Sequence, residues 1–128
     1  MAGLLFLDTN VLIFGADREH PMSAQVHQWL LAGQRLSVSA MAWSEFLCGP
    51  VPAETVQAWE RLLGTAAVVP IDRLIAERAA ILFNRTGRRS RSLPDCMIAA
   101  TAMTHGARLA TLNRADFEPL LRYGLELA

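Results

Sequence analysis

The chain has 128 residues, of which 52% are hydrophobic and 19% are charged. This length and apolar fraction suit one folded domain and exclude an intrinsically disordered chain. The twelve basic residues are all arginines, and twelve acidic residues balance them, so the formal net charge is zero. No overall electrostatic field therefore attracts nucleic acid, and any such affinity must come from a local basic cluster or from bound metal.

Short apolar segments alternate with helix-like segments along the chain. The first, Leu4–Leu7, has no polar alternation, which predicts a strand buried on both faces. Helical spacing of apolar residues and the positions of glycine, proline and capping residues define the later segments. In chain order we expect the strand Leu4–Leu7, helices at 11–14 and 22–31, a strand at 36–39, and helices at 41–48 and 54–63. A strand at 66–69, a helix at 72–84, a loop at 85–93, a helix at 95–105, a strand at 108–111 and a candidate fifth strand at 125–127 follow.

This alternation predicts an α/β fold. Buried strands joined by helices favour three layers, α/β/α, around a central parallel sheet of four or five short strands. No linker or repeat interrupts the chain, so residues 1–128 are expected to form a single domain. In such folds a ligand site lies beyond the carboxyl ends of the strands.

Four carboxylates lie near the expected strand ends. Asp8 directly follows the first strand, Glu45 lies in the helix after the second, Asp95 is in the first turn of a later helix, and Asp116 follows the strand at 108–111. Each alone has an ordinary explanation as a helix cap, a turn residue or a solvated charge. Together they predict a site for a hard cation, because clustered carboxylates repel one another unless a cation lies among them. Such a site suits hydrolysis of a phosphodiester.

Three segments resemble the PIN domain family: FLDTNVLI, VSAMAWSEFLCG and LPDCMIAATAMTHGARLATLNRADF. More narrowly, the chain resembles VapC-type toxins of bacterial type II toxin–antitoxin pairs, over essentially its whole length. The resemblance implies an endoribonuclease that depends on Mg²⁺ or Mn²⁺, a cognate antitoxin partner, and a homodimer that assembles further with the antitoxin. Asp8 and Asp95 match the most dependable metal ligands of that family, Glu45 its helix-borne acid and Asp116 the acid of its last motif.

The fourth acid and its neighbours leave alternatives open. Some members of the family carry an acid where this chain has Asn113, so the fourth carboxylate is either absent or supplied by Asp116. We predict that Asp116 supplies it, while Asn113 can still coordinate or orient a water through its amide oxygen. Thr9, Asn10 and Thr111 either hold the carboxylates through hydrogen bonds or only cap helices.

Four arginines precede Asp95 within seven residues: Arg85, Arg88, Arg89 and Arg91. We predict that they contact RNA, because guanidinium groups bind phosphate and stack on exposed bases. A solvated loop and a contact with the antitoxin are the alternatives.

This chain lacks residues that other classes of protein with a similar start require. Haloacid-dehalogenase phosphatases and response-regulator receivers also carry an aspartate after the first strand, but both need a lysine. Glycine-rich nucleotide-binding motifs are missing as well. One alternative remains, a PIN-like module that binds RNA or protein without cleavage. With no secretory signal and no apolar run long enough for a membrane span, we expect a cytoplasmic protein that does not contact membranes.

Overall fold

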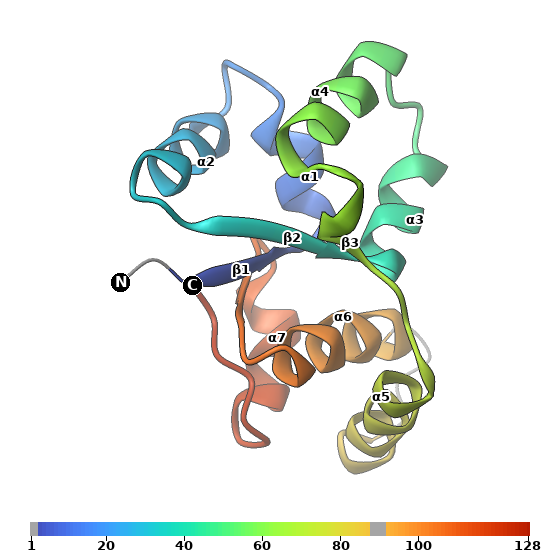
Figure 1. Cartoon of the computed structure of the whole chain (residues 1–128). Helices are drawn as coiled ribbons and strands as arrows, with labels where there is room; N and C mark the ends of the chain where they lie inside the picture. Colours follow the sequence, from blue (N-terminus) through green and yellow to red (C-terminus); the bar gives the residue numbers. More distant parts are fainter. Residues whose placement is uncertain (1–2, 88–91) are drawn as a thin grey trace.

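A computed structural model describes residues 3–87 and 92–128 and has a parallel sheet at its centre (Figure 1). Its four strands lie in the order β3-β2-β1-β4. Every strand pair is parallel, as is expected when helices connect successive strands. The strands are β1 (Leu4–Leu7), β2 (Arg35–Ser39), β3 (Val68–Val69) and β4 (Arg108–Ala110).

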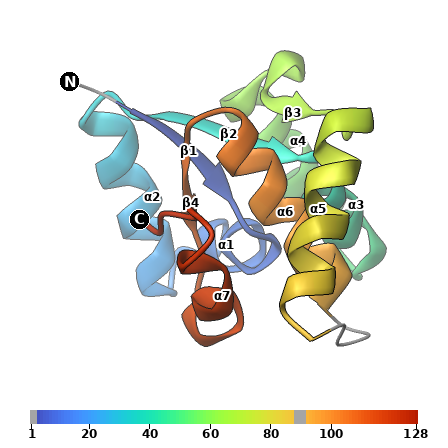
Figure 2. The same cartoon turned by 90° about the horizontal axis from the view of Figure 1, so that it is seen from below.

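Helices cover both faces of this sheet, which confirms the predicted three-layer α/β/α class (Figure 1). One layer holds α1 (Thr9–Gly15), α2 (Pro21–Leu31), α3 (Ala40–Cys48) and α4 (Ala53–Leu63). The other holds α5 (Arg73–Arg85), α6 (Ser92–Thr104) and α7 (Arg114–Leu121). Figure 2 looks at the second layer and shows α6 between α5 and α7.

The register of the sheet brings distant strand ends together. Phe6 of the central strand β1 pairs with Ser37 on one side and with Leu109 on the other. The backbone N–H of Asp8 then donates to the carbonyl of Ala110 at 2.9 Å, so β1 and β4 end side by side. This edge is where parallel α/β sheets place their ligands.

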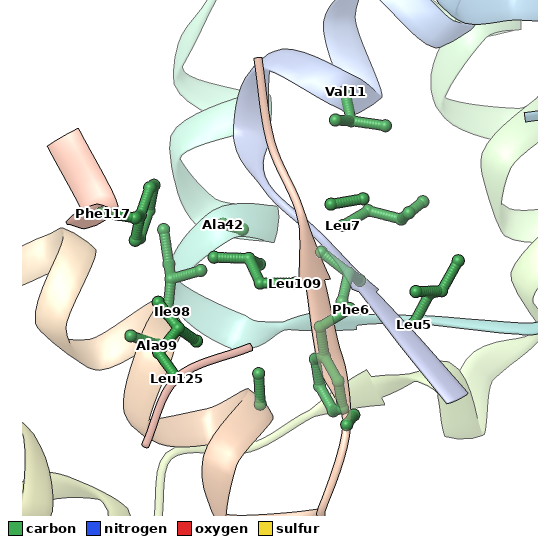
Figure 3. Packing of buried hydrophobic residues seen from close by; sticks show 14 of the residues in the cluster. Leu5, Phe6, Leu7, Val11, Ala42, Ile98, Ala99, Leu109, Phe117 and Leu125 are labelled. Carbon is green, nitrogen blue, oxygen red and sulfur yellow. The ribbon is translucent and has the colours of Figure 1, made fainter. Parts of the chain in front are cut away.

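The core explains the apolar runs. Leu5, Phe6 and Leu7 are all buried, because β1 has helices on both faces. Figure 3 shows these side chains together with residues of the other strands and helices, among them Ile98 of α6 and Phe117 of α7. α6 is apolar on nearly every side and lies deep in its layer, as such a helix must. No helix in the described ranges is both long and apolar enough to cross a membrane.

Several boundaries differ from the sequence predictions. Asp8, not Asn10, caps the first helix, because its extended backbone lets its carboxylate accept from the N–H of Thr9. The expected strand at 66–69 is a 3₁₀ turn (Thr65–Ala67) followed by the two-residue β3. The expected fifth strand is a single parallel bridge between Leu109 and Leu127.

Two helices also depart from expectation. α6 begins at Ser92, so Leu93 is helical and not part of a loop; Pro94 fits in the first turn, where a missing N–H costs nothing. The helix α7 was not predicted at all. It forms over a segment that contains Pro119, and Phe117 and Leu120 bury the same face at helical spacing.

Candidate metal centre

Asp8 is the most buried of the four predicted carboxylates, with 5% of its surface exposed. One oxygen, Oδ1, accepts from the backbone N–H of Thr9 at 2.8 Å. The other, Oδ2, accepts from the hydroxyl of Thr111 at 2.7 Å. The side chain is therefore fixed at the end of β1 by groups from both neighbouring segments.

Glu45 approaches the same edge from α3 and is exposed to solvent. The hydroxyl of Thr9 donates to its Oε1 at 2.8 Å, across 36 residues of sequence. Thr9 therefore contributes its backbone to Asp8 and its side chain to Glu45. This arrangement corresponds to the predicted supporting role of Thr9 and Thr111, in which hydroxyl groups orient the carboxylates.

Asp95 and Asp116 lie on the helix side of the site. Asp95 is half-buried in the first turn of α6, and Asp116 is exposed in the first turn of α7. Both line a cavity of ≈ 310 Å³ between the end of α5, the start of α6 and α7. Thr86 and Cys96 also line it. No sequence pattern indicated these two residues, because their place depends on how the three helices pack.

The charges of the four acids act on one another. Burial, followed by the negative charges of Asp8, Asp116 and Glu45, raises the pKa of Asp95 from 3.8 to about 7. Burial also raises the pKa of Asp8; the bonds from Thr111 and Thr9 oppose this rise, while Glu45 and Asp116 add to it. The pKa of the Cys96 thiol is raised as well, chiefly by burial and then by Asp95.

The two asparagines behave differently from the threonines. The side chain of Asn10 accepts from the backbone N–H of Leu112 at 3.1 Å and so holds the segment after β4. Asn113 is the N-cap residue of α7 but makes no capping bond with its side chain. Its backbone N–H donates to the Thr111 hydroxyl, which connects it to Asp8 through one residue.

The predicted arginine cluster lies only partly within the described residues. Arg85 is exposed at the end of α5, next to the cavity that holds Asp95. Arg88, Arg89 and Arg91 lie outside the described residues. Within the described part, no arginine forms an ion pair with any of the four carboxylates.

The donor set fits a hard divalent cation. It consists of carboxylate oxygens. Burial is the main cause of the raised pKa of Asp95, and the negative charges of Asp8, Asp116 and Glu45 add to it. No basic group in residues 3–87 and 92–128 forms an ion pair with these acids. In those same ranges no three acidic, histidine or cysteine side chains enclose an ion as they stand. Asp8 and Glu45 are instead turned to the threonines.

Comparison with known proteins identifies the family of this chain. The model of the PIN domain family matches residues 5–118. The chain belongs to the PIN domain family. It is 34% identical over 116 residues to ribonuclease VapC10 of Mycobacterium tuberculosis, covering 86% of this chain and 83% of that protein.

Solved structures agree with this PIN domain assignment. A chain of a toxin–antitoxin complex from Klebsiella pneumoniae is 30% identical and matches with a TM-score of 0.68, over 89% of this chain and 90% of that one. A chain of DNA-bound VapBC from Salmonella typhimurium matches with a TM-score of 0.73, over 100% and 98% of the two chains. The identity in that case is 21%, so this similarity concerns the fold.

Proposed function

We propose that this PIN domain is an endoribonuclease that depends on Mg²⁺ or Mn²⁺ and acts as the toxin of a toxin–antitoxin pair. The observation that carries the proposal is that four carboxylates, from the end of β1 and from α3, α6 and α7, lie near enough to one another for three of them to act on the charge of Asp95. The similarity to a protein named ribonuclease VapC10 supports RNA as the substrate.

Asp8 and Asp95 would hold the cation, with Glu45 and Asp116 completing the oxygen donor set. When bound, the cation would supply an activated water and neutralise charge on the scissile phosphate. The residues of the chain do the positioning. Thr111 and Thr9 fix both oxygens of Asp8, and Thr9 also holds Glu45, so neither carboxylate must be ordered when substrate arrives.

A surface on the layer that holds α1 to α4 is the support for an antitoxin partner. Trp59 and Phe46 are buried and belong to the core. Apolar side chains of the same layer that are exposed include Ile13 (46%) and Phe14 (39%) of α1 and Leu47 (47%) of α3. Ile13 lines a cavity of ≈ 240 Å³ between α1, α3 and the turn before α4, and this surface suits the apolar face of an antitoxin helix.

We also propose a homodimer that assembles further with the antitoxin in the cytoplasm. The similarity to a chain taken from a toxin–antitoxin complex supports the assembly with an antitoxin. The homodimer is what the resemblance to VapC-type toxins implies. Light scattering of the protein with and without the antitoxin encoded beside it would measure both states.

Cleavage of RNA by the purified protein tests the proposal. A pool of single-stranded RNAs should be cut internally in Mn²⁺ or Mg²⁺, and chelation of the metal should stop the reaction. Production of the protein alone should also arrest growth, while co-production of the antitoxin should restore it. RNA that is bound but never cut in either metal would instead establish the module that binds without cleavage.

A further inference from the structure

A groove follows α6 away from the carboxylates. Figure 2 shows α6 between α5 and α7. The groove consists of two cavities that lie one after the other. The residues that line them come from α6, from α5 and the residue after it, and from α7 and the turn after it. The first contains Asp95 and Asp116. The second, of ≈ 320 Å³, lies further along α6 at Ala100 and Met103.

The second cavity differs from the first in charge. Arg78 and Arg85 of α5 line it, and among its described lining residues there is no acid. Glu77, an acid of α5, is already paired with Arg73 at 2.6 Å. In sequence, residues 78–94 contain five arginines and no aspartate or glutamate. Among the described residues, Arg78 and Arg85 therefore give this wall of the cavity a positive charge.

An aromatic ring lies between two of the arginines. Tyr123 follows α7 and is half-buried, with the guanidinium of Arg122 5.3 Å and that of Arg85 5.9 Å from its ring centre. Both arginines are exposed, so either can turn towards a phosphate while the ring stays in place. Ile81 and Met103 add apolar surface next to the ring.

We propose that this second cavity is a binding site for a nucleotide of the RNA strand beyond the cleavage site. Its base lies against Tyr123 and the apolar surface next to the ring, and its phosphate binds Arg78 and Arg85. A base needs a flat apolar or aromatic surface, and a phosphate needs exposed guanidinium groups; the cavity offers both together. The inference rests on the proposed ribonuclease function and extends it to the path of the substrate.

The spacing agrees with one continuous strand. Ala100 and Met103 come five and eight residues after Asp95 on the same helix, which corresponds to about 8–12 Å along its axis. A strand whose scissile phosphate lies at the carboxylates therefore reaches the second cavity within a few nucleotides. The charge of the lining favours this polyanion over a second copy of the chain, whose net charge is zero.

Binding of a fluorescein-labelled single-stranded RNA dodecamer, measured by anisotropy in EDTA over a series of salt concentrations, tests the site. Tyr123→Leu should lower the affinity about tenfold without changing the salt dependence, whereas Tyr123→Phe keeps the ring and should bind normally. The double variant Arg78→Gln/Arg85→Gln should reduce the salt slope by about 1.4, because each phosphate contact on a single strand contributes about 0.7. Arg35→Gln/Arg61→Gln, which removes two exposed arginines outside the groove, is the matched control.

The outcomes separate this site from the nuclease function. Unchanged RNA binding by Tyr123→Leu and by the groove double variant overturns the inference, even if the protein cuts RNA. If both variants instead change only the oligomeric state of the protein and leave RNA binding unchanged, the surface is an interface between copies of the chain. The inference is then also wrong. If binding changes as expected but wild-type protein cuts no RNA in Mn²⁺, the nucleotide site stands and the proposed nuclease function fails.

Discussion

The two halves of the carboxylate site are held in different ways. On the sheet side, Asp8 and Glu45 both accept hydrogen bonds from threonine side chains, and Asp8 is nearly inaccessible to solvent. On the helix side, within the described residues, Asp95 and Asp116 accept no side-chain hydrogen bond and face a cavity. The first half is part of the framework, whereas the second is open to a ligand.

This difference shows how a small domain can tolerate clustered negative charge. Hydrogen bonds favour the charged form of Asp8 and offset part of the cost of burying it. Asp95 has no such help, and its pKa rises to about 7. A bound cation would therefore relieve unfavourable burial and repulsion of negative charge mainly at Asp95, on the helix side.

Neutralising either of the two proposed principal metal ligands should have the largest effect on the rate of RNA cleavage. We expect Asp8→Asn and Asp95→Asn each to lower the rate of RNA cleavage about a thousandfold or more, because several kcal/mol of charge stabilisation are lost. Asp17→Asn, an exposed acid outside the site, should cut normally. Initial rates with labelled RNA in Mn²⁺ give the comparison, and near-normal cutting by either ligand variant would rule out the assigned metal site.

The fourth ligand is the next test. Asp116→Asn should lower the cleavage rate about a hundredfold, because a charged donor on the open side is lost. Asn113→Ala should change the rate far less, because its side chain makes no cap bond. The same rate assay compares the two variants, and the opposite order would mean that Asn113 has replaced the missing acid.

The hydrogen bonds of the sheet side should matter less than the ligands themselves. Thr111→Val removes the bond to Asp8 and should weaken Mn²⁺ binding about 10–100-fold, whereas Thr111→Ser keeps the hydroxyl and should bind normally. Calorimetric titration with Mn²⁺ measures the affinity. Equal affinities for the valine and serine variants would show that packing alone fixes Asp8.

The smallest expected effect concerns stability without metal. Folded Asp95 keeps its proton up to about pH 7, while the unfolded group loses it near 3.8, so the folded state binds more protons between these values. The free energy of unfolding should therefore fall as pH rises from about 4 to 7 and then level off. Asp95→Asn removes this loss and should melt a few degrees higher than wild type at pH 8 in EDTA.

Adding Mn²⁺ to both proteins provides the control for that measurement. The cation should raise the melting temperature of wild type more than that of Asp95→Asn, because ligand binding stabilises only the form with a complete site. A lower melting temperature for Asp95→Asn in EDTA would show that the carboxylate makes a stabilising contact.

Local patterns predicted the framework of this fold better than its details. The all-apolar run of β1 is a local signal, and it predicted this strand correctly. α7 was missed because Pro119 suggested a turn, while the packing that stabilises the helix comes from distant residues. The two-residue β3 depends on pairing with β2, which no local pattern reveals.

The candidate site follows the same rule. That Asp8 would lie at a strand end could be predicted, because parallel strands share an edge. The bond from Thr9 to Glu45 and the placing of Asp116 beside Asp95 require the packed helices. Tyr123 and Arg78 gave no signal in the sequence, because the groove joins segments that are far apart along the chain.

The bond between Asp8 and Thr111 spans 103 residues and has a consequence for synthesis. A ribosome adds about 5–20 residues per second, so Asp8 emerges about 5–20 s before the hydroxyl that fixes it. During that interval β1 has no β4 beside it, and Asp95 and Asp116 have not yet joined the site. Under the proposed function, a nascent chain therefore has no complete carboxylate site until the segment that contains Thr111 and Asp116 has emerged.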